Sequence, residues 1–146
     1  MHLQGFISLK VYLFILMTKL TFKYFIPAII WLLIITIISG YPGNQVPKIP
    51  VWQFDKLVHT VIYLELTICL LYAYHQQYIN DKKRLLIVAY VVLFGIFYGA
   101  FMEILQHYIF INRSGNWYDF FANTIGSILG VFIYPFVIKL LPINRC

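Results

Sequence analysis

Four long stretches of apolar residues, separated by short polar segments, dominate the pattern along the chain. They run over residues 22–39, 57–74, 85–107 and 120–140. A helix needs about 20 mostly apolar residues to cross the hydrocarbon core of a bilayer, and each stretch is close to that length. Because hydrocarbon offers the backbone no hydrogen-bond partners, such segments must be helices or strands of a closed barrel. The pattern predicts an all-α polytopic membrane protein, a bundle of four transmembrane helices.

Residues 1–20 fit this pattern less clearly than the rest of the chain. The run from Val11 to Met17 is apolar but too short to span a bilayer. Lys10 precedes the run as it would in a secretory signal, yet no small-x-small cleavage site follows. Either Met17 is the true start, or residues 1–20 extend the first helix or lie along the membrane surface. We therefore divide the chain into an N-terminal extension, residues 1–20, and a transmembrane domain, residues 21–142.

The composition indicates that lipid, not water, surrounds most of the chain. Hydrophobic residues make up 62% of the sequence and charged residues 11%, against roughly 45–50% and about 25% in an ordinary soluble domain. Such a chain cannot cover itself with polar surface. The net charge of +6 would suit a nucleic-acid partner, but the basic residues sit at the ends of apolar runs and form no patch. The sequence predicts contact with membrane lipids and no nucleic-acid partner.

Lysine and arginine predict the orientation of the helices, because the cytoplasmic flanks of membrane helices carry most of these residues. Eight of them lie on one side: Lys10, Lys19, Lys23, Lys82, Lys83, Arg84, Lys139 and Arg145. The three on the other side are Lys48, Lys56 and Arg113. We expect both termini and the 75–84 loop in the cytoplasm, and the 40–56 and 108–118 loops on the outer side.

Polar residues gather at the predicted helix ends on the outer side. Asp55 and His59 are four residues apart at the start of the second stretch, which places them on one helix face. Asp119 and Asn123 have the same spacing at the start of the fourth stretch. Glu103 and Gln106, three positions apart, lie near the outer end of the third stretch. The candidate ligand-binding residues are Asp55, Lys56, His59, Glu103, Gln106, Arg113, Asp119 and Asn123.

Each member of this set also has a structural explanation. Asp55 and Asp119 could cap helices, lysine and arginine at helix ends can extend to lipid headgroups, and the histidine and the amides could be hydrogen-bonded inside the bundle. Ionisable residues within hydrocarbon cost about 2.5–3.5 kcal/mol each on insertion scales, so they normally face the bundle interior and pair. It is the convergence of the set on one leaflet that favours a binding site. His59 and Glu103 lie inside their stretches and are the candidate catalytic residues, although no catalytic role is assigned.

Three chemistries suit these residue types. His59 and Glu103 could act as a general acid–base pair. A zinc site could use the same kinds of ligand, and His107 lies four residues after Glu103, but the chain has no HExxH motif and no paired-cysteine spacing. We therefore predict no metal and no cofactor. Lys56, Arg113 and the first amides of two helices could instead meet a phosphate, and lipid-linked cell-wall precursors carry phosphates at this depth.

Small residues recur every four positions on the third and fourth stretches. They are Gly95 and Gly99 on the third, and Ala122, Gly126 and Gly130 on the fourth. Such rows let helices approach closely in lipid. They predict tight packing within one chain, and a homo-oligomer formed through the same rows is the alternative.

The order of these motifs resembles that of the VanZ-like family of small bacterial membrane proteins. The matching pieces are Ser39-Gly40-Tyr41-Pro42-Gly43, then Asp55-Lys56-Leu57-Val58-His59 with Tyr63, then residues 98–106 (YGAFMEILQ), and then Arg113, Asp119, Asn123, Gly126 and Gly130. The similarity covers roughly residues 20–135, and Glu65, His107 and residues 1–16 fall outside it. The family is named for an accessory protein associated with resistance to teicoplanin, a glycopeptide that acts on cell-wall precursors. The resemblance implies a bacterial inner or plasma membrane and brings no defined reaction with it.

Three functions follow as hypotheses. The leading one is a cell-envelope protein whose outward-facing polar site binds an anionic lipid-linked or peptidoglycan-related ligand, such as a lipid-linked cell-wall precursor, and which is linked to teicoplanin resistance. The second is a membrane-embedded hydrolase or transferase that uses His59 and Glu103. The third is a structural or assembly subunit of a membrane complex. A transporter fits less well, because four helices leave little room for alternating access.

Overall fold

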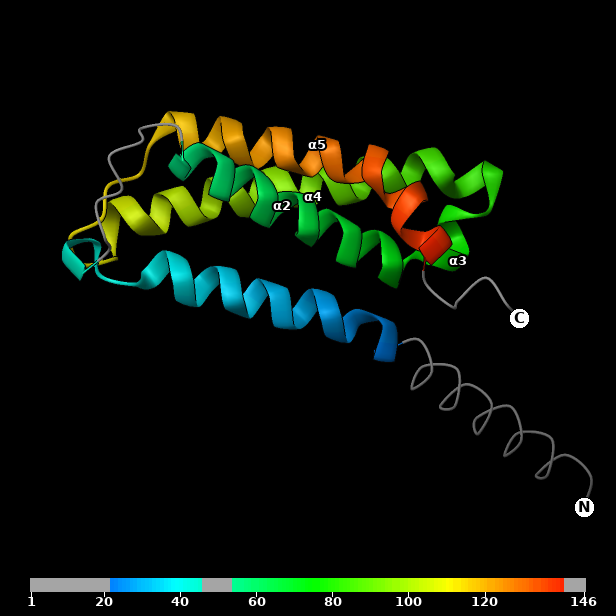
Figure 1. Ribbon diagram of the computed structural model, residues 1–146, viewed down its shortest axis with the longest axis horizontal. Helices are drawn as coiled ribbons and strands as arrows, with labels where there is room; N and C mark the ends of the chain where they lie inside the picture. The colour runs from blue at the N-terminus through cyan, green and yellow to red at the C-terminus, as the bar shows by residue number, and fades with distance from the viewer. Residues whose placement is uncertain (1–21, 46–53, 141–146) are drawn as a thin grey trace, which may run out of the picture.

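The chain forms a bundle of four long helices, as the computed structural model of residues 22–45 and 54–140 shows (Figure 1). The elements are the first span Phe22–Gly40, the 3-10 helix η1 Gly43–Gln45, α2 Phe54–Ala73, α3 His75–Tyr78, α4 Asp81–Tyr108 and α5 Trp117–Leu140. All regular structure in these residues is helical, and the four long helices are apolar enough to cross a membrane. The predicted all-α, multi-pass fold is confirmed. The predicted boundary between residues 20 and 21 lies outside the described residues and stays a prediction.

The helices begin earlier than the apolar pattern predicts, because polar residues complete their first turns. α4 begins at residue 81 instead of 85, and the Asn80 side chain accepts a hydrogen bond from the backbone of the first turn at 3.1 Å. α5 begins at residue 117 instead of 120, and the Asn116 side chain makes the same kind of bond, also at 3.1 Å. α2 begins at residue 54 instead of 57. Asp55 and Asp119 therefore lie inside first turns, where their side chains are available for contacts between helices.

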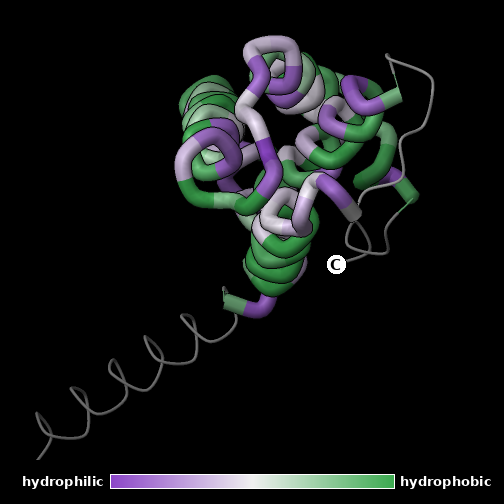
Figure 2. Tube along the Cα trace, turned by 90° about the vertical axis from the view of Figure 1, so that its left-hand side faces the viewer, coloured by the Kyte–Doolittle hydropathy of each residue, from purple (hydrophilic) through white to green (hydrophobic). Residues whose placement is uncertain are grey.

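Three helices, α2, α4 and α5, pack against one another, and the first span lies along one side of them (Figures 1 and 2). The buried core contains Tyr63 and Leu66 of α2 and Tyr134 of α5. The first span buries Ala28 and Ile35, while most of its other side chains remain exposed at the surface that lipid would cover. The core is thus the seam between helices that a membrane bundle requires.

Glycines set the close approach of α2, α4 and α5. A Cβ on Gly126 of α5 would collide with the backbone carbonyl of Thr60 on α2. A Cβ on Gly99 of α4 would stand 3.1 Å from the Cβ of Asn123 on α5. These rows of small residues therefore pack within the chain, as one of the two interpretations of the sequence predicted. A homo-oligomer through the rows stays a prediction.

Two ring side chains with polar atoms, Trp31 and His75, make hydrogen bonds inside the bundle. Trp31 lies at the middle of the first span and donates its ring N–H to the carbonyl of Ile62 on α2 at 2.8 Å. His75 is buried in α3, where its Nδ1 lies 2.8 Å from the hydroxyl of Tyr134. Burial lowers the pKa of the His75 imidazole, so the ring stays neutral at ordinary pH.

One end of the bundle, which we call the polar end, collects the segments that carry the candidate residues. It consists of the exit of the first span, the first turns of α2 and α5, and the end of α4 with the 109–116 loop. Figure 2 looks onto this end and shows polar residues on its loops and first turns, with apolar residues along the helices behind. The amide of Gly43 donates to the carbonyl of Ile111 at 3.4 Å, and Asn112 turns the loop with a φ of 55°. The exit of the first span is thereby tied to the loop that leads into α5.

Candidate functional site

The centre of the polar end is an ion-paired lysine between two helices. Lys56, in the first turn of α2, donates to Asp55 Oδ2 at 2.9 Å and to Asp119 Oδ1 of α5. The Asp119 side chain is only 9% exposed, and that of Asp55 is 59% exposed. A buried carboxylate needs a partner to offset the loss of hydration. Lys56 therefore fastens α5 to α2 and is not extended toward lipid headgroups.

His59 lies one turn deeper, and an amide fixes its orientation. Its Nδ1 lies 3.0 Å from Asn123 Oδ1 on α5. Because an amide oxygen only accepts hydrogen bonds, Nδ1 is the donor in this contact, and Nε2 is the ring nitrogen left for another partner. Nε2 faces Asp55 Oδ1 at 3.8 Å and Asp119 Oδ2 at 4.0 Å. The ring thus turns its free nitrogen toward the carboxylates.

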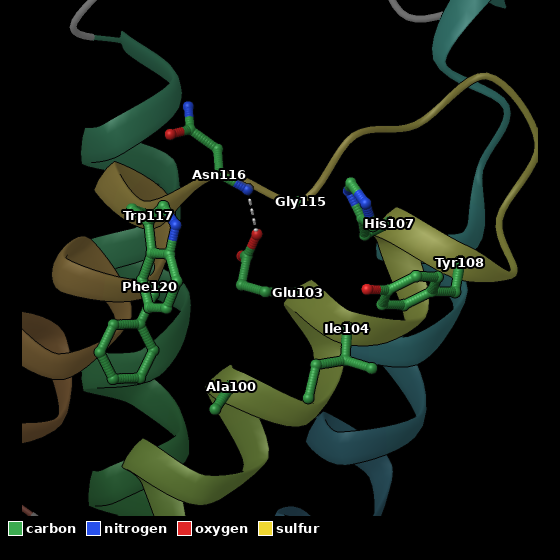
Figure 3. Close-up of a pocket in the computed structure, with 9 residues that line it drawn as sticks. All are labelled: Ala100, Glu103, Ile104, His107, Tyr108, Gly115, Asn116, Trp117 and Phe120. Carbon is green, nitrogen blue, oxygen red and sulfur yellow. Dashed lines mark hydrogen bonds between the residues drawn. The ribbon is translucent and has the colours of Figure 1, made fainter.

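Glu103, on α4, lines a separate pocket beside this cluster. Its Oε2 accepts a hydrogen bond from the backbone amide of Asn116 at 2.9 Å, and Figure 3 shows the carboxylate pointing toward that amide. The pocket has a volume of about 430 Å³ and mostly apolar walls, with Trp117 and Phe120 of α5 on one side and Ile104 of α4 on the other. Glu103 also lies within electrostatic range of Lys56, His59 and Asp119. It therefore connects the pocket with the charged cluster.

Gln106 and Arg113 turn to the first span and not to the cluster. Gln106 Nε2 donates to the Ser39 carbonyl at 3.5 Å. Arg113 donates to the carbonyl of Tyr41 at 3.1 Å and to that of Ile38 at 3.3 Å. The last carbonyls of a helix have no partners within the helix, and these two side chains supply partners for them. In this arrangement they hold the end of the first span.

The structure therefore divides the eight candidate residues into three groups. Asp55, Lys56, His59, Asp119 and Asn123 form one cluster, which we call the Asp–His cluster. Glu103 lies beside it, and the remaining two residues bind the first span. Glu103 and His107, considered as a metal pair from the sequence, both line the pocket, but only Asp55, His59 and Asp119 are grouped closely enough to share a cation among the described residues.

One buried polar residue near the cluster, Tyr63, adds to the set that the sequence predicted, and one predicted member, Asn123, has a buried donor of its own. Tyr63 is four residues beyond His59 on α2, and its hydroxyl is buried without a hydrogen-bond partner among the described residues. Asn123 Nδ2 is likewise buried without a hydrogen-bond partner among the described residues. It lies 3.3 Å from the position that a Cβ on Gly99 would occupy. Buried polar atoms without partners are uncommon in proteins. The four-residue spacing from His59 to Tyr63 was the signal in the sequence, but only the packing of three helices shows that Gly99 leaves space beside both.

The charge of the site bears on which ligands it suits. Among the described residues, the carboxylates of Asp55 and Asp119 bind the ammonium of Lys56, the Glu103 carboxylate lies within electrostatic range of it, and Arg113 is engaged with helix carbonyls. Three carboxyl groups beside one ammonium make this part of the site rich in acidic groups. One of the chemistries considered from the sequence had Lys56 and Arg113 meeting a phosphate, and in the structure both side chains bind other partners. A phosphate would require additional positive charge here.

Comparison with known proteins identifies one family. The family model described as VanZ/LLP1 matches residues 9–139, which is most of the chain and includes every residue of the site. No curated protein matches, and no solved structure matches.

Proposed function

The chain belongs to the VanZ-like family, and on that premise we propose that it is a bacterial inner- or plasma-membrane protein of the cell envelope whose polar end faces outward and binds a phosphate-bearing, lipid-linked ligand. The ligand class includes lipid-linked cell-wall precursors. A link to teicoplanin susceptibility forms part of the same proposal, because teicoplanin acts on those precursors.

The observation that carries this proposal is the position of an apolar pocket next to a charged cluster at one end of the bundle. A lipid-linked phosphate has a long apolar chain and a charged head, which need opposite environments a few ångströms apart. Trp117 and Phe120 offer the chain an apolar wall, and Glu103 connects that wall with the Asp–His cluster. Ligand sites with apolar walls and a few converging polar groups are the common form of small-molecule site.

Substitution of the cluster tests the proposal in cells. In a strain whose teicoplanin susceptibility depends on this chain, we expect His59→Ala, Glu103→Ala and Asp119→Ala each to bring the minimum inhibitory concentration to that of a strain lacking the chain. The reason is that each removes a group of the binding site. Membrane fractionation would show that the variants are still inserted.

Asp81→Ala is the matched control, because Asp81 is an exposed carboxylate in the first turn of α4, at the opposite end of the bundle, and forms a local ion pair with Arg84. It should leave the inhibitory concentration unchanged. Full retention of the phenotype in all three cluster variants would exclude the site assignment, whatever amount of each variant is found in the membrane fraction.

A second candidate function is a membrane-embedded hydrolase or transferase. The observation that favours it is that His59 and Glu103 interact electrostatically across the α2–α4 interface, while His59 Nε2 remains available beyond hydrogen-bond distance of the carboxylates. Turnover of a lipid phosphate by the purified chain, lost in His59→Gln, would support this function. Ligand binding without turnover under the same conditions would favour the binding protein.

A further inference from the structure

We propose that Asp55, His59 and Asp119 bind a divalent transition-metal cation, Zn²⁺ or Mn²⁺, on the side of the two carboxylates that Lys56 leaves open. The cation would be the positive charge through which the site holds a phosphate. This second step rests on the proposed function, whereas the binding of the cation does not.

The two oxygens of each aspartate have different neighbours. Lys56 takes Asp55 Oδ2 and Asp119 Oδ1, and the remaining two oxygens, Asp55 Oδ1 and Asp119 Oδ2, face His59 Nε2 at 3.8 and 4.0 Å. These separations exceed hydrogen-bond distances. The lysine and the cation would therefore use opposite edges of the same carboxylates, and neither would need to displace the other.

The three ligand atoms are close to the spacing of a metal site. One ligand atom from each of the three residues lies within 4.8 Å of the other two. Ligands bound tetrahedrally at about 2.0–2.1 Å are about 3.4 Å apart, so the two His59 separations would have to shorten by about 0.5 Å and the separation of the two aspartate oxygens by up to about 1.4 Å. Asp55 is the most exposed of the three side chains, at 59%, and has room to move. An imidazole with two carboxylates is a ligand set that suits Zn²⁺ or Mn²⁺.

Asn123 supplies the outer contact that metal-binding histidines have. Metal-ligating histidines almost always donate their other ring N–H to an oxygen, which fixes the ring and its tautomer. Asn123 Oδ1 accepts from His59 Nδ1 at 3.0 Å, and the Asn123 side chain is almost fully buried. Nε2 is thereby fixed toward the carboxylates before any ligand arrives.

A second, independent observation also indicates a ligand. Asn123 is 1% exposed, and its Nδ2 is a buried donor without a partner among the described residues, on the α4 side of the cluster. A buried unpaired donor costs about 1–3 kcal/mol, and an oxygen of a polar ligand that extends from the cluster to the Gly99 side would relieve that cost.

The charge count favours the same conclusion. Lys56 and the two aspartates that it contacts carry one net negative charge, 2 − 1 = 1, and the nearby Glu103 carboxylate would make it two, 3 − 1 = 2. A divalent cation would change the first total to one net positive charge and the second to zero. Three protein ligands leave a coordination position open, so the bound cation could accept a phosphate oxygen. The cation would thereby reduce the conflict between an acidic site and an anionic ligand.

The alternative explanation is a protonated His59 that pairs with both aspartates. Metal binding by the purified, untagged full chain in detergent separates the two. After treatment with a chelator and equilibrium dialysis against Zn²⁺ or Mn²⁺, we expect about one equivalent of metal by mass spectrometry for the unmodified chain. His59→Gln and Asp119→Asn should weaken binding by about tenfold or more, because each removes a ligand of the cation.

Asp81→Asn is the matched control and should bind as the unmodified chain does. Circular dichroism and gel filtration would show that each variant is folded, and the metal should raise the thermal unfolding midpoint of the unmodified chain but not of His59→Gln. Absence of metal from the folded unmodified chain, or equal binding by folded His59→Gln, would overturn the proposal and leave the protonated ion pair.

A polyprenyl phosphate in the same detergent separates this inference from the proposed function. We expect the metal to raise its affinity for the unmodified chain by about tenfold and to have no effect on His59→Gln. Metal binding without polyprenyl-phosphate binding would retain the cation site and overturn the proposed function. If polyprenyl phosphate binds equally with and without metal, the proposed function is retained and the role of the cation as a bridge to the phosphate is overturned. Equal competition by inorganic phosphate would identify free phosphate as the ligand.

Discussion

Asp119 shows how far a single residue can be interpreted from the sequence. Its spacing from Asn123 placed both on one face of a helix, and the structure has them there, within the first two turns of α5. The spacing could not show that Lys56 of α2 would bind this aspartate, because that contact depends on how α2 and α5 pair. Arg113 is the opposite case, since its charge suggested an anion and its actual partners are the backbone carbonyls of the first span.

Removal of the lysine should destabilise the bundle. In Lys56→Met the Asp119 carboxylate, whose side chain is 9% exposed, loses its ammonium partner. Breaking a fully buried pair costs about 3–5 kcal/mol, and because the Lys56 side chain is 20% exposed we expect about 2 kcal/mol less free energy of unfolding. Chemical denaturation in detergent would measure the change.

Lys82→Met, an exposed lysine in the first turn of α4, is the control and should be neutral. The inferred cation site adds a further expectation: Zn²⁺ should restore part of the stability lost in Lys56→Met, because a cation can replace the ammonium as partner of Asp119. If Lys56→Met without metal is as stable as the unmodified chain, the Lys56–Asp119 pair contributes nothing to the stability of the fold.

At the scale of the helix, the apolar stretches predicted the number of elements, but their ends depend on polar side chains. Asn80 and Asn116 begin α4 and α5 several residues ahead of the apolar runs. The length of an apolar stretch carries no information about such local hydrogen bonds, so it does not predict where the helix begins. The rows of small residues were better predictors, because a glycine facing another helix in lipid has one main use, which is close approach.

Gly126 is the position at which that close approach can be tested. In Gly126→Ala the new Cβ would meet the backbone carbonyl of Thr60, which cannot rotate away, so α5 must move from α2. Alanine favours a helix by about 1 kcal/mol over glycine, but overpacking of this kind typically costs about 1–3 kcal/mol. We expect a net loss of unfolding free energy, and also weaker metal binding, because the cluster spans the same two helices.

Gly40→Ala is the matched control, since its Cβ would stand 3.5 Å from the Phe110 ring, an ordinary contact. It should be neutral or slightly stabilising in the same denaturation experiment. Equal stability of the two alanine variants would show that the α2–α5 seam tolerates separation and that the glycine row does not set its spacing.

At the scale of the whole molecule, the sequence predicted the architecture and only part of the site. Hydrophobic length is sufficient for four membrane helices, because a bilayer permits few other solutions. The grouping of the polar residues at one end also followed from the order of the helices. The separation of Gln106 and Arg113 from the Asp–His cluster did not, because it depends on where the first span lies against the other three helices.

The orientation of the bundle is the property of the whole molecule on which the envelope proposal depends. Among the described residues, the end opposite the polar end carries Lys23, Lys82, Lys83, Arg84 and Lys139. Among the same residues, the polar end carries Lys56 and Arg113, and both are bound to groups of the protein: Lys56 to aspartates and Arg113 to carbonyls. The positive-inside rule therefore predicts that the polar end faces outward.

Reporter fusions test this orientation. A fusion after Asn80, in the loop before α4, should be active only with a cytoplasmic reporter, and a fusion after Gly115, before α5, only with an extracytoplasmic one. Single cysteines at Asn80 and Asn112, labelled in intact cells with a membrane-impermeant thiol reagent, provide a check without truncation: Asn112→Cys should react and Asn80→Cys should not. The reverse pattern would place the Asp–His cluster in the cytoplasm, where it could still bind a cation but could not meet an outward-facing cell-wall precursor.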